Sequence, residues 1–218
     1  MLRIVKPEIL DRLSADDPAV SRARRDLQMI NGLMGNHRWI LRQLQPLVRS
    51  GDRLVEWGGG DGSLARMIDA RRTSLPAFSL TVIDQAPPPP DLPETISWSS
   101  RNLLDRRSPT LRAAIVIANL ILHHFEPDSL RQLGAMLHPE CRTIIACEPV
   151  RRRCHQWQLR LLRLLGIHPI TRHDAHVSVG AGFRGNELAE GLGLHPSDWT
   201  VRIRETALGA HRLLAIRK

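Results

Sequence analysis

The chain of 218 residues has no tyrosine, three phenylalanines and five tryptophans. This shortage argues against the arrays of stacking aromatic rings that bind single-stranded nucleic acid. Its three cysteines, Cys141, Cys147 and Cys154, include no C-x-x-C pair, so we expect no disulfide framework. No apolar run reaches the ~18 residues of a transmembrane helix, and charges interrupt the first residues too early for a signal peptide. These absences predict a cytoplasmic protein without a membrane span.

Lysine is also scarce, because only Lys6 and Lys218 are lysine among 31 basic residues. The formal net charge of +9 would suit an anionic partner such as nucleic acid. Apart from the run at 151–153, however, the arginines are scattered, so charge alone is a weak indication of nucleic-acid binding. Hydrophobic residues make up 42% of the chain, which is enough for a folded core.

Strand-like and helix-like patterns alternate along the chain. Residues 7–50 are predicted to be helical, with one helix starting at Asp17-Pro18 and a second after Gly35-Asn36. Short apolar runs then predict strands, and helical spacing lies between them. The predicted strands are 53–57, 78–84, 96–98, the start of 113–122, 142–149, 200–205 and 211–218; the predicted helices are 63–72, a segment from 129, 155–166 and 186–194, and 167–185 is predicted to be a polar loop.

This alternation predicts an α/β fold, a doubly wound, seven-stranded and mostly parallel sheet that ends in an antiparallel hairpin. Ligands of such sheets bind at the carboxyl ends of the strands. We expect residues 48–218 to form this domain and residues 1–47 to form a helical cap over its ligand edge. Met34 and Trp39 in the cap are either core residues or a lid over an aromatic ligand.

The segment EWGGGDG, from Glu56 to Gly62, joins a predicted strand to a predicted helix. Its glycines allow positive φ angles and a close approach of ligand to backbone. A phosphate-binding P-loop would need a lysine and a hydroxyl residue after the last glycine, and a dinucleotide loop would need glycine where Ser63 stands. What remains is a loop for a ligand without a pyrophosphate, or a plain glycine turn.

The next predicted strand ends in Asp84. An acid at this place can accept two hydrogen bonds from a ribose diol, or it can simply cap a turn. In combination with the glycine loop, we favour the ribose interpretation.

These residues resemble a known family. EWGGGDG followed by TVID is similar to the glycine loop and acidic strand end of class I S-adenosylmethionine-dependent methyltransferases, and ISWSSRNLLD, AAIVIANLILHHF and TIIACEPVRR resemble their third, fourth and fifth motifs. The resemblance covers residues 48–218 and fits the small-molecule branch best. A fainter match, SVGAGFRGNEL at 178–188, resembles methyltransferases of quinone or phenolic-lipid pathways.

The resemblance implies roles for several residues toward S-adenosylmethionine. Gly58 and Gly60 would let its methionine part lie on the backbone, and Glu56 would act near its amino group. Asp84 would hold the ribose hydroxyls, with Gln85 beside the adenine.

Further along the chain, Asn102 stands where the family often has an acid bonded to the adenine amino group, with Leu103 beside it and Asp105 as the fallback. Asparagine departs from that acid but still offers a carbonyl acceptor. Asn119 and Leu120, after the fourth strand, would line the sulfonium side.

His123 and His124 follow the fourth strand and are candidates for a general base. A phenol with a pKa near ~10 benefits from a histidine that is neutral at pH 7. If the turn is helical, at most one of them faces the acceptor, and otherwise one packs while the other caps the next helix. The implied reaction is O-methylation of a small phenolic, quinone-precursor or polyketide-type metabolite.

Two further segments have alternative interpretations. His173-Asp174-x-His176 lacks evident third and fourth metal ligands, so we expect no metal site there but a loop at the acceptor pocket, with His173 or His176 as a second base candidate. The arginines at 151–153 form a solvated helix start or attract an anionic acceptor.

Two rival functions remain open. An RNA methyltransferase would use the basic surface, but NLIL stands where such enzymes carry an Asn/Asp-Pro-Pro-Tyr/Phe motif. A binding protein that keeps the fold without catalysis is the other. The predicted partner is a small-molecule acceptor, and the sequence is compatible with a homodimer.

Overall fold

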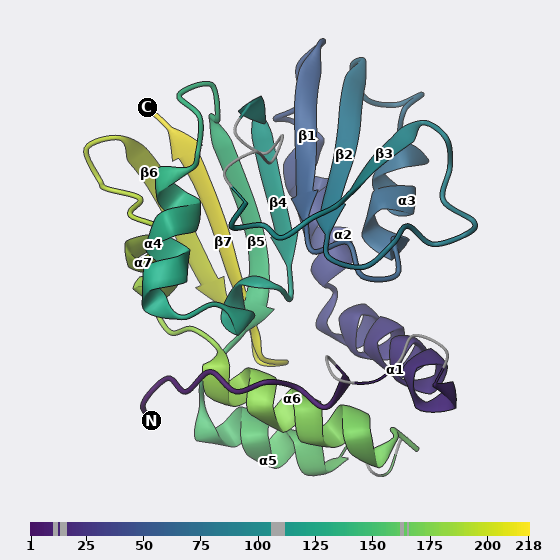
Figure 1. The fold of residues 1–218 in the computed structure, drawn as a ribbon. Coiled ribbons are helices and arrows are strands. Elements are labelled where there is room, and N and C mark those ends of the chain that lie inside the picture. Colours follow the sequence, from purple (N-terminus) through teal and green to yellow (C-terminus); the bar gives the residue numbers. More distant parts are fainter. Residues whose placement is uncertain (11–12, 14–16, 106–111, 162–163, 165) are drawn as a thin grey trace.

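The computed structural model describes residues 1–218 except 11–12, 14–16, 106–111, 162–163 and 165 (Figure 1). Its strands form one sheet in the order β3-β2-β1-β4-β5-β7-β6. β7 runs antiparallel to its neighbours β5 and β6, and the other pairs are parallel. The strands are β1 (Asp52–Trp57), β2 (Phe78–Asp84), β3 (Ile96–Ser100), β4 (Ile115–Asn119), β5 (Thr143–Pro149), β6 (Trp199–Glu205) and β7 (Ala210–Arg217). The predicted doubly wound, seven-stranded sheet is confirmed.

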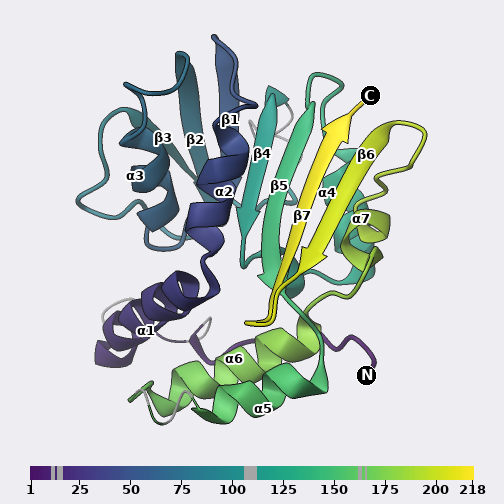
Figure 2. The same ribbon diagram turned by 180° about the vertical axis from the view of Figure 1, so that it is seen from behind.

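Helices cover both faces of the sheet, because its parallel strands are apolar on both sides. On one face α2 (Asn36–Leu44) and α3 (Ser63–Asp69) pack on Leu54 of β1, and on the other α4 (Pro127–Ala135) and α7 (Glu187–Gly191) share a cluster with Val55 (Figure 2). Neighbouring residues of β1 thus point to opposite faces, as the strand period requires. In the described part of the chain, no helix is long and apolar enough to cross a membrane.

Local sequence signals determine where the N-terminal helices begin and end. The Asp17 side chain accepts a hydrogen bond of 2.8 Å from the N–H of Ala19 and caps α1 (Pro18–Met34). Gly35, with a φ of +64°, ends α1 and precedes α2. Both predicted helix starts are confirmed. Residues 7 and 8, predicted as helix, instead belong to an extended N-terminal segment.

A third group of helices lies beyond the carboxyl ends of the parallel strands, where α1, α5 (Arg153–Leu161) and α6 (Pro169–Ala181) gather (Figure 1). The prediction of a loop over 167–185 is wrong, since α6 occupies most of it. The buried face of α6 carries Thr171 and Asp174, which are 1% and 3% exposed. Polar residues on the buried side hide the apolar periodicity that would have indicated a helix.

Arg151 does not lie at a solvated helix start, as one interpretation of the arginine run had it. Its side chain is buried, and its two terminal nitrogens donate to Glu187 at 2.5 and 3.0 Å. A bidentate pair of this kind fixes the chain after β5 to the start of α7.

Candidate functional site

A cavity of about 620 Å³ opens at the carboxyl ends of the central strands. Its lining includes the ends of β1, β2 and β4, where a doubly wound sheet changes the direction of its connections. α1, α5 and α6 contribute the other walls. Among the predicted site residues, those that line the cavity are Glu56, Gly58, Gly60, Asp84, Asn119, Leu120, His123 and His124.

The glycine loop combines tight packing with one open position. Gly58 and Gly60 have φ angles of +72° and +53°. A Cβ atom on Gly58 would lie 2.6 Å from Ile121, and one on Gly59 would lie 2.2 Å from Val82. At Gly60 a Cβ would meet nothing within 4 Å. The backbone at Gly60 is therefore accessible to a ligand, whereas Gly58 and Gly59 are also needed for packing.

Glu56 ends β1 against the cavity and is 2% exposed. In the described part of the chain, no group makes a hydrogen bond to its Oε2 atom. Burial, with the charges of Asp61 and Asp84 nearby, raises the pKa of Glu56 well above its usual value. An unpaired buried carboxyl beside a cavity suits a ligand that brings a cationic group.

Asp84 connects the end of β2 to the glycine loop of β1. Its Oδ2 accepts a 2.8 Å hydrogen bond from the N–H of Gly60, and its Oδ1 accepts one of 2.8 Å from Ala86. The carboxylate is half-buried and lines the cavity. It is therefore held in place with lone pairs left for a ligand.

Three predicted cofactor residues lie outside this lining. Gln85 is exposed, and its neighbour Ala86 lines the cavity instead. Asn102 is also exposed and accepts a hydrogen bond from the N–H of Leu104 at 2.9 Å, while Leu103 is buried in the core. A direct contact of these three with a ligand in the cavity stays a prediction.

Asn119 and Leu120 end β4 with an unusual backbone. Leu120 has a φ of +56°, and no other described non-glycine residue has a positive φ. Such a conformation is strained and often marks a functional turn. The Asn119 amide donates to Asn31 of α1 at 3.1 Å, so this turn is tied to the helix above the cavity.

The two histidines lie on the short 3₁₀ helix η3 (Leu122–His124) that follows, and both line the cavity. Nδ1 of the buried His123 is 2.7 Å from Glu148, the acid at the end of β5. Glu148 is fully buried and also accepts N–H groups from the turn at Ile121, Leu122 and His123, at 3.1, 2.9 and 3.2 Å.

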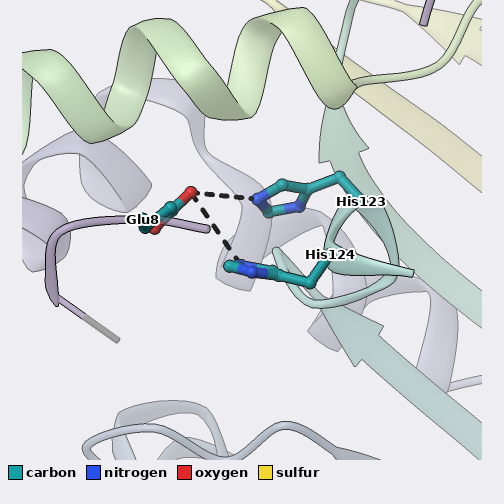
Figure 3. Close-up of side chains that lie close together, drawn as sticks. All are labelled: Glu8, His123 and His124. Carbon is teal, nitrogen blue, oxygen red and sulfur yellow. Dashed lines mark ion pairs between the residues drawn. The ribbon is translucent and has the colours of Figure 1, made fainter. Parts of the chain in front are cut away.

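A second carboxylate approaches the same histidines from the N-terminal segment. Glu8 Oε1 lies 3.6 Å from Nε2 of His123 and 3.9 Å from Nε2 of His124 (Figure 3). Burial lowers the pKa of His123, but the hydrogen bond to Glu148 and the charge of Glu8 outweigh it and raise the pKa to about 9. Burial raises the pKa of Glu8, but the contacts with the two histidines lower it by more, so that the pKa lies below its usual value.

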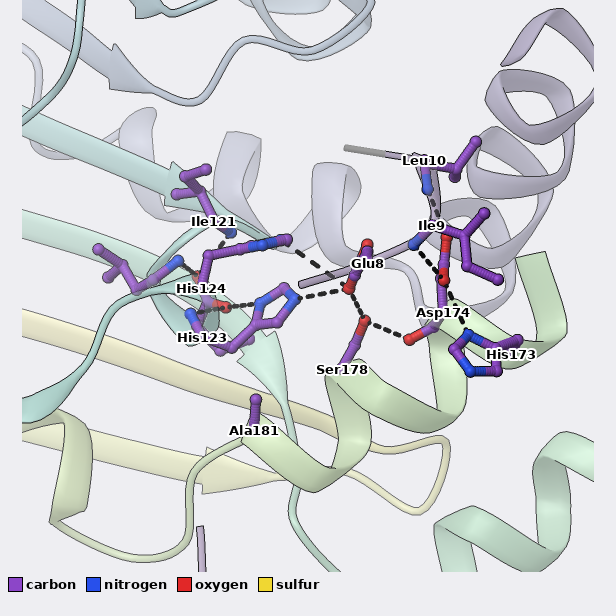
Figure 4. A network of polar contacts seen from close by, with 12 residues as sticks. Glu8, Ile9, Leu10, Ile121, His123, His124, His173, Asp174, Ser178 and Ala181 are labelled. Atoms are coloured by element: carbon purple, nitrogen blue, oxygen red, sulfur yellow. Dashed lines mark hydrogen bonds and ion pairs between the residues drawn. The ribbon is translucent and has the colours of Figure 1, made fainter. Parts of the chain in front are cut away.

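The N-terminal segment is held in place by several contacts. Asp174 of α6 accepts hydrogen bonds from the N–H groups of Ile9 and Leu10, at 2.9 and 3.0 Å (Figure 4). Arg3 donates to the carbonyl oxygens of His123 and Phe125, at 3.1 and 2.8 Å. Asp174 thus positions the segment that carries Glu8.

The donor atoms of Glu8, His123 and His124 lie within 4.8 Å of one another, and no other group of this kind is found in the described ranges. A divalent ion can bridge such a distance. A protonated His123 between Glu8 and Glu148, however, already neutralises one of the two carboxylates. The arrangement therefore also suits the transfer of a proton. In the other segment considered for a metal, Asp174 binds the N-terminal segment. Neither His173 nor His176 lines the cavity, so their role as a base stays a prediction.

Sequence reasoning missed Glu8 and Glu148. Glu148 lies in the last two residues of its strand, as Glu56 and Asp84 do in theirs, so the same strand-end rule would have identified it. Glu8 carries no comparable signal, because its segment meets the histidines from the far end of the chain.

Solved structures share this architecture. The plantazolicin methyltransferase BpumL, in complex with a pentazolic desmethylPZN analog and SAH, matches with a TM-score of 0.67 at 13% identity, over 93% of this chain and 92% of that one. The chain has the methyltransferase fold. The pyocyanin biosynthetic protein PhzM matches with a TM-score of 0.57 at 18% identity, over 96% of this chain and 60% of that one. The CMeT domain of the citrinin polyketide synthase gives 0.54 at 14% identity, over 82% and 52%. No protein-family model and no curated protein sequence matches the chain.

Proposed function

We propose that the protein transfers a methyl group from S-adenosylmethionine to a hydroxyl group of a small organic acceptor. The observation that carries this proposal is the pairing of an open backbone at Gly60 with the unpaired, buried carboxyl of Glu56 above the same cavity. That combination fits a ligand with a flat or bulky body and an ammonium group. The presence of SAH in BpumL, a protein with the same fold, adds support.

Three residues would hold the cofactor. The carboxylate of Glu56 would pair with its amino group, which would restore the ionised form that burial disfavours. Asp84 would accept hydrogen bonds from the ribose hydroxyls, and Gly60 would leave room beside the backbone. When bound, S-adenosylmethionine supplies a methyl group on a sulfonium sulfur, which is activated for in-line displacement.

His123 would take the proton from the acceptor hydroxyl. Glu148 holds Nδ1 of its ring, so Nε2 is left toward Glu8 and the cavity. With a pKa of about 9, the neutral form of His123 is a strong proton acceptor for a phenol whose own pKa is ~10. His124 shares the Glu8 contact and is the alternative base.

The other walls would align the two reactants and exclude water. Gln28 of α1 donates to Asp61 of the glycine loop at 2.6 Å, which ties the helix to the cofactor side of the cavity. None of the described lining residues is arginine or lysine. This favours a small acceptor over RNA, because phosphate groups need cationic partners.

The test is a methyl-transfer assay. The protein is incubated with methyl-labelled S-adenosylmethionine and a mixture of phenols, and products are analysed by mass spectrometry. We expect a labelled methyl ether, and at least a tenfold loss of its rate in Asp84→Ala. Asp91→Ala serves as the matched control, since Asp91 lies in the exposed connection after β2 and does not line the cavity. Equal rates in both variants would contradict the assigned role of Asp84.

A further inference from the structure

α1 turns an apolar stripe toward the cavity. Val20, Ala23, Leu27, Ile30 and Met34 recur every three or four residues, so they share one face of the helix, and all five line the cavity. A stripe of this kind normally packs on a protein core. Here it faces a space large enough for a ligand.

The stripe lies outside the two hydrophobic clusters of the sheet, although Ala23 is fully buried. Two hydrophobic clusters fill the two faces of the sheet, and neither includes a described residue of α1. The helix stands off the sheet, beside α6 (Figures 1 and 2). Leu27 is still 38% exposed and Leu33, which also lines the cavity, is 52% exposed. Apolar surface of this extent is left for something other than the core to cover.

Polar contacts set the position of α1. Asp26 accepts hydrogen bonds of 2.9 Å from the N–H of His168 and from the hydroxyl of Thr171, which begin α6. Closer to the C-terminal end of α1, the side chain of Asn31 accepts a hydrogen bond of 3.1 Å from the Asn119 amide. These contacts hold the helix over the cavity without using its apolar stripe.

The opposite wall of the cavity is also apolar. It includes Leu159 of α5, Ala175 and Val179 of α6, and Leu208 in the turn between β6 and β7. Two apolar surfaces therefore face each other across one end of the cavity. Of the four acidic lining residues, Glu56, Asp61 and Asp84 lie at the ends of β1 and β2 or in the loop after β1, and Glu8 lies beside the histidines.

At the apolar end, the described residues offer no arginine or lysine as counter-charge to an ionic group, and the ring of His155, which also lines the cavity, is hydrogen-bonded. No described lining residue is arginine or lysine, although the chain has 31 basic residues. Gln158, a polar residue of this wall, is engaged with His155 at 2.7 Å and with the carbonyl of Ala207 at 3.1 Å. Burying an ionised tail here would cost its hydration without a compensating partner.

We propose that the space between α1 and the wall formed by α5 and α6 binds an alkyl chain of an uncharged acceptor, whose hydroxyl lies at His123. The assignment of that hydroxyl rests on the proposed function. The alkyl-chain site itself rests on the apolar stripe, the opposing wall and the lack of arginine and lysine among the described lining residues. Because the site is continuous with the histidines in one cavity, ring and chain belong to a single molecule.

The test is a binding series that needs no turnover. The full chain, with and without saturating SAH, is titrated with 4-alkylphenols that carry two, four, six or eight carbons. We expect the Kd to fall about fourfold with each added methylene, the factor for burying one CH₂ group, until the cavity is filled. A Kd that does not depend on chain length would overturn the proposal.

Two variants of α1 make the test specific. Ile30→Asp places a carboxylate in the alkyl-chain site, and Met29→Asp places one beside it on a residue that is 45% exposed and outside the lining. We expect Ile30→Asp to bind 4-octylphenol at least tenfold more weakly and 4-ethylphenol almost unchanged, whereas Met29→Asp should behave as the wild type. Equal effects of both variants would overturn the proposal. SAH is titrated separately: failure to bind SAH would contradict the proposed function, while the chain-length series would still decide the alkyl-chain site.

Discussion

Nδ1 of His123 lies 2.7 Å from the fully buried carboxylate of Glu148, which also accepts three main-chain N–H groups of the turn that carries the histidine. One strand-end acid thus fixes both the backbone and the ring of its neighbour. In this bond Nδ1 of His123 carries the proton and donates it to the carboxylate of Glu148. Nε2 is left facing Glu8 and the cavity.

This geometry predicts a pH dependence of methyl transfer. With a pKa of about 9, His123 is mostly protonated at pH 7 and cannot accept a proton. We expect kcat/KM for a phenol to rise about tenfold per pH unit and to level off near pH 9. A stopped assay in overlapping buffers measures the profile. In Glu148→Gln the pKa of His123 should fall, so that the plateau begins at lower pH with a lower maximum. A flat profile in the wild type would contradict the base role.

Glu8 is predicted to act on turnover and not on cofactor binding. Glu8→Gln keeps the shape of the side chain but removes the charge next to both histidines. Because Glu8 raises the pKa of His123, we expect the plateau of kcat to begin at lower pH and to reach a lower maximum, with an unchanged Kd for SAH. Glu94→Gln, at an exposed position, is the control and should keep both values. If SAH binding fell together with kcat, Glu8 would be supporting the fold rather than the reaction.

Glu56 is predicted to lower stability in the absence of ligand. Its pKa is raised on folding, so the folded state binds more protons and the free energy of unfolding falls as pH rises from about 4.5 through the folded pKa. Glu56→Gln removes this loss. We expect a higher Tm than the wild type at pH 8, by about 2–4 °C for each kcal/mol gained, and no gain at pH 4. Thermal unfolding at both pH values is the measurement, and a lower Tm at pH 8 would refute it.

Gly60 is predicted to be open for a ligand and not for packing. Asparagine tolerates a positive φ, so Gly60→Asn should fold with a Tm close to that of the wild type. Its side chain would extend into the cavity, and we expect at least a tenfold weaker Kd for SAH. Gly193→Asn is the matched control, because Gly193 has a φ of +65°, open space around it and no place in the cavity lining. SAH binding that survives in Gly60→Asn would remove Gly60 from the site.

The sequence predicted the sheet well because local patterns encode it. Apolar runs ending in Glu56 and Asp84 became β1 and β2, and the hairpin of β6 and β7 followed its predicted spacing. α6 was missed because Asp174 on its buried face serves the N-terminal segment, a partner that a local pattern cannot reveal.

The same limit applies to the candidate site. Residues at strand ends were found because the topology of the sheet brings such ends together. Glu8 joins His123 through the path of the N-terminal segment, which the contacts of Arg3 and Asp174 determine. Those contacts span most of the chain, so neither spacing nor composition predicted them.

We propose that the cavity at Gly60 receives an adenosyl ligand held by Glu56 and Asp84. Calorimetric titration of the purified chain with SAH is the decisive measurement. We expect saturable binding at one site, weakened at least tenfold in Asp84→Ala and in Gly60→Asn but not in Gly193→Asn. The absence of binding to a folded wild-type chain, or equal affinity in all four proteins, would contradict it.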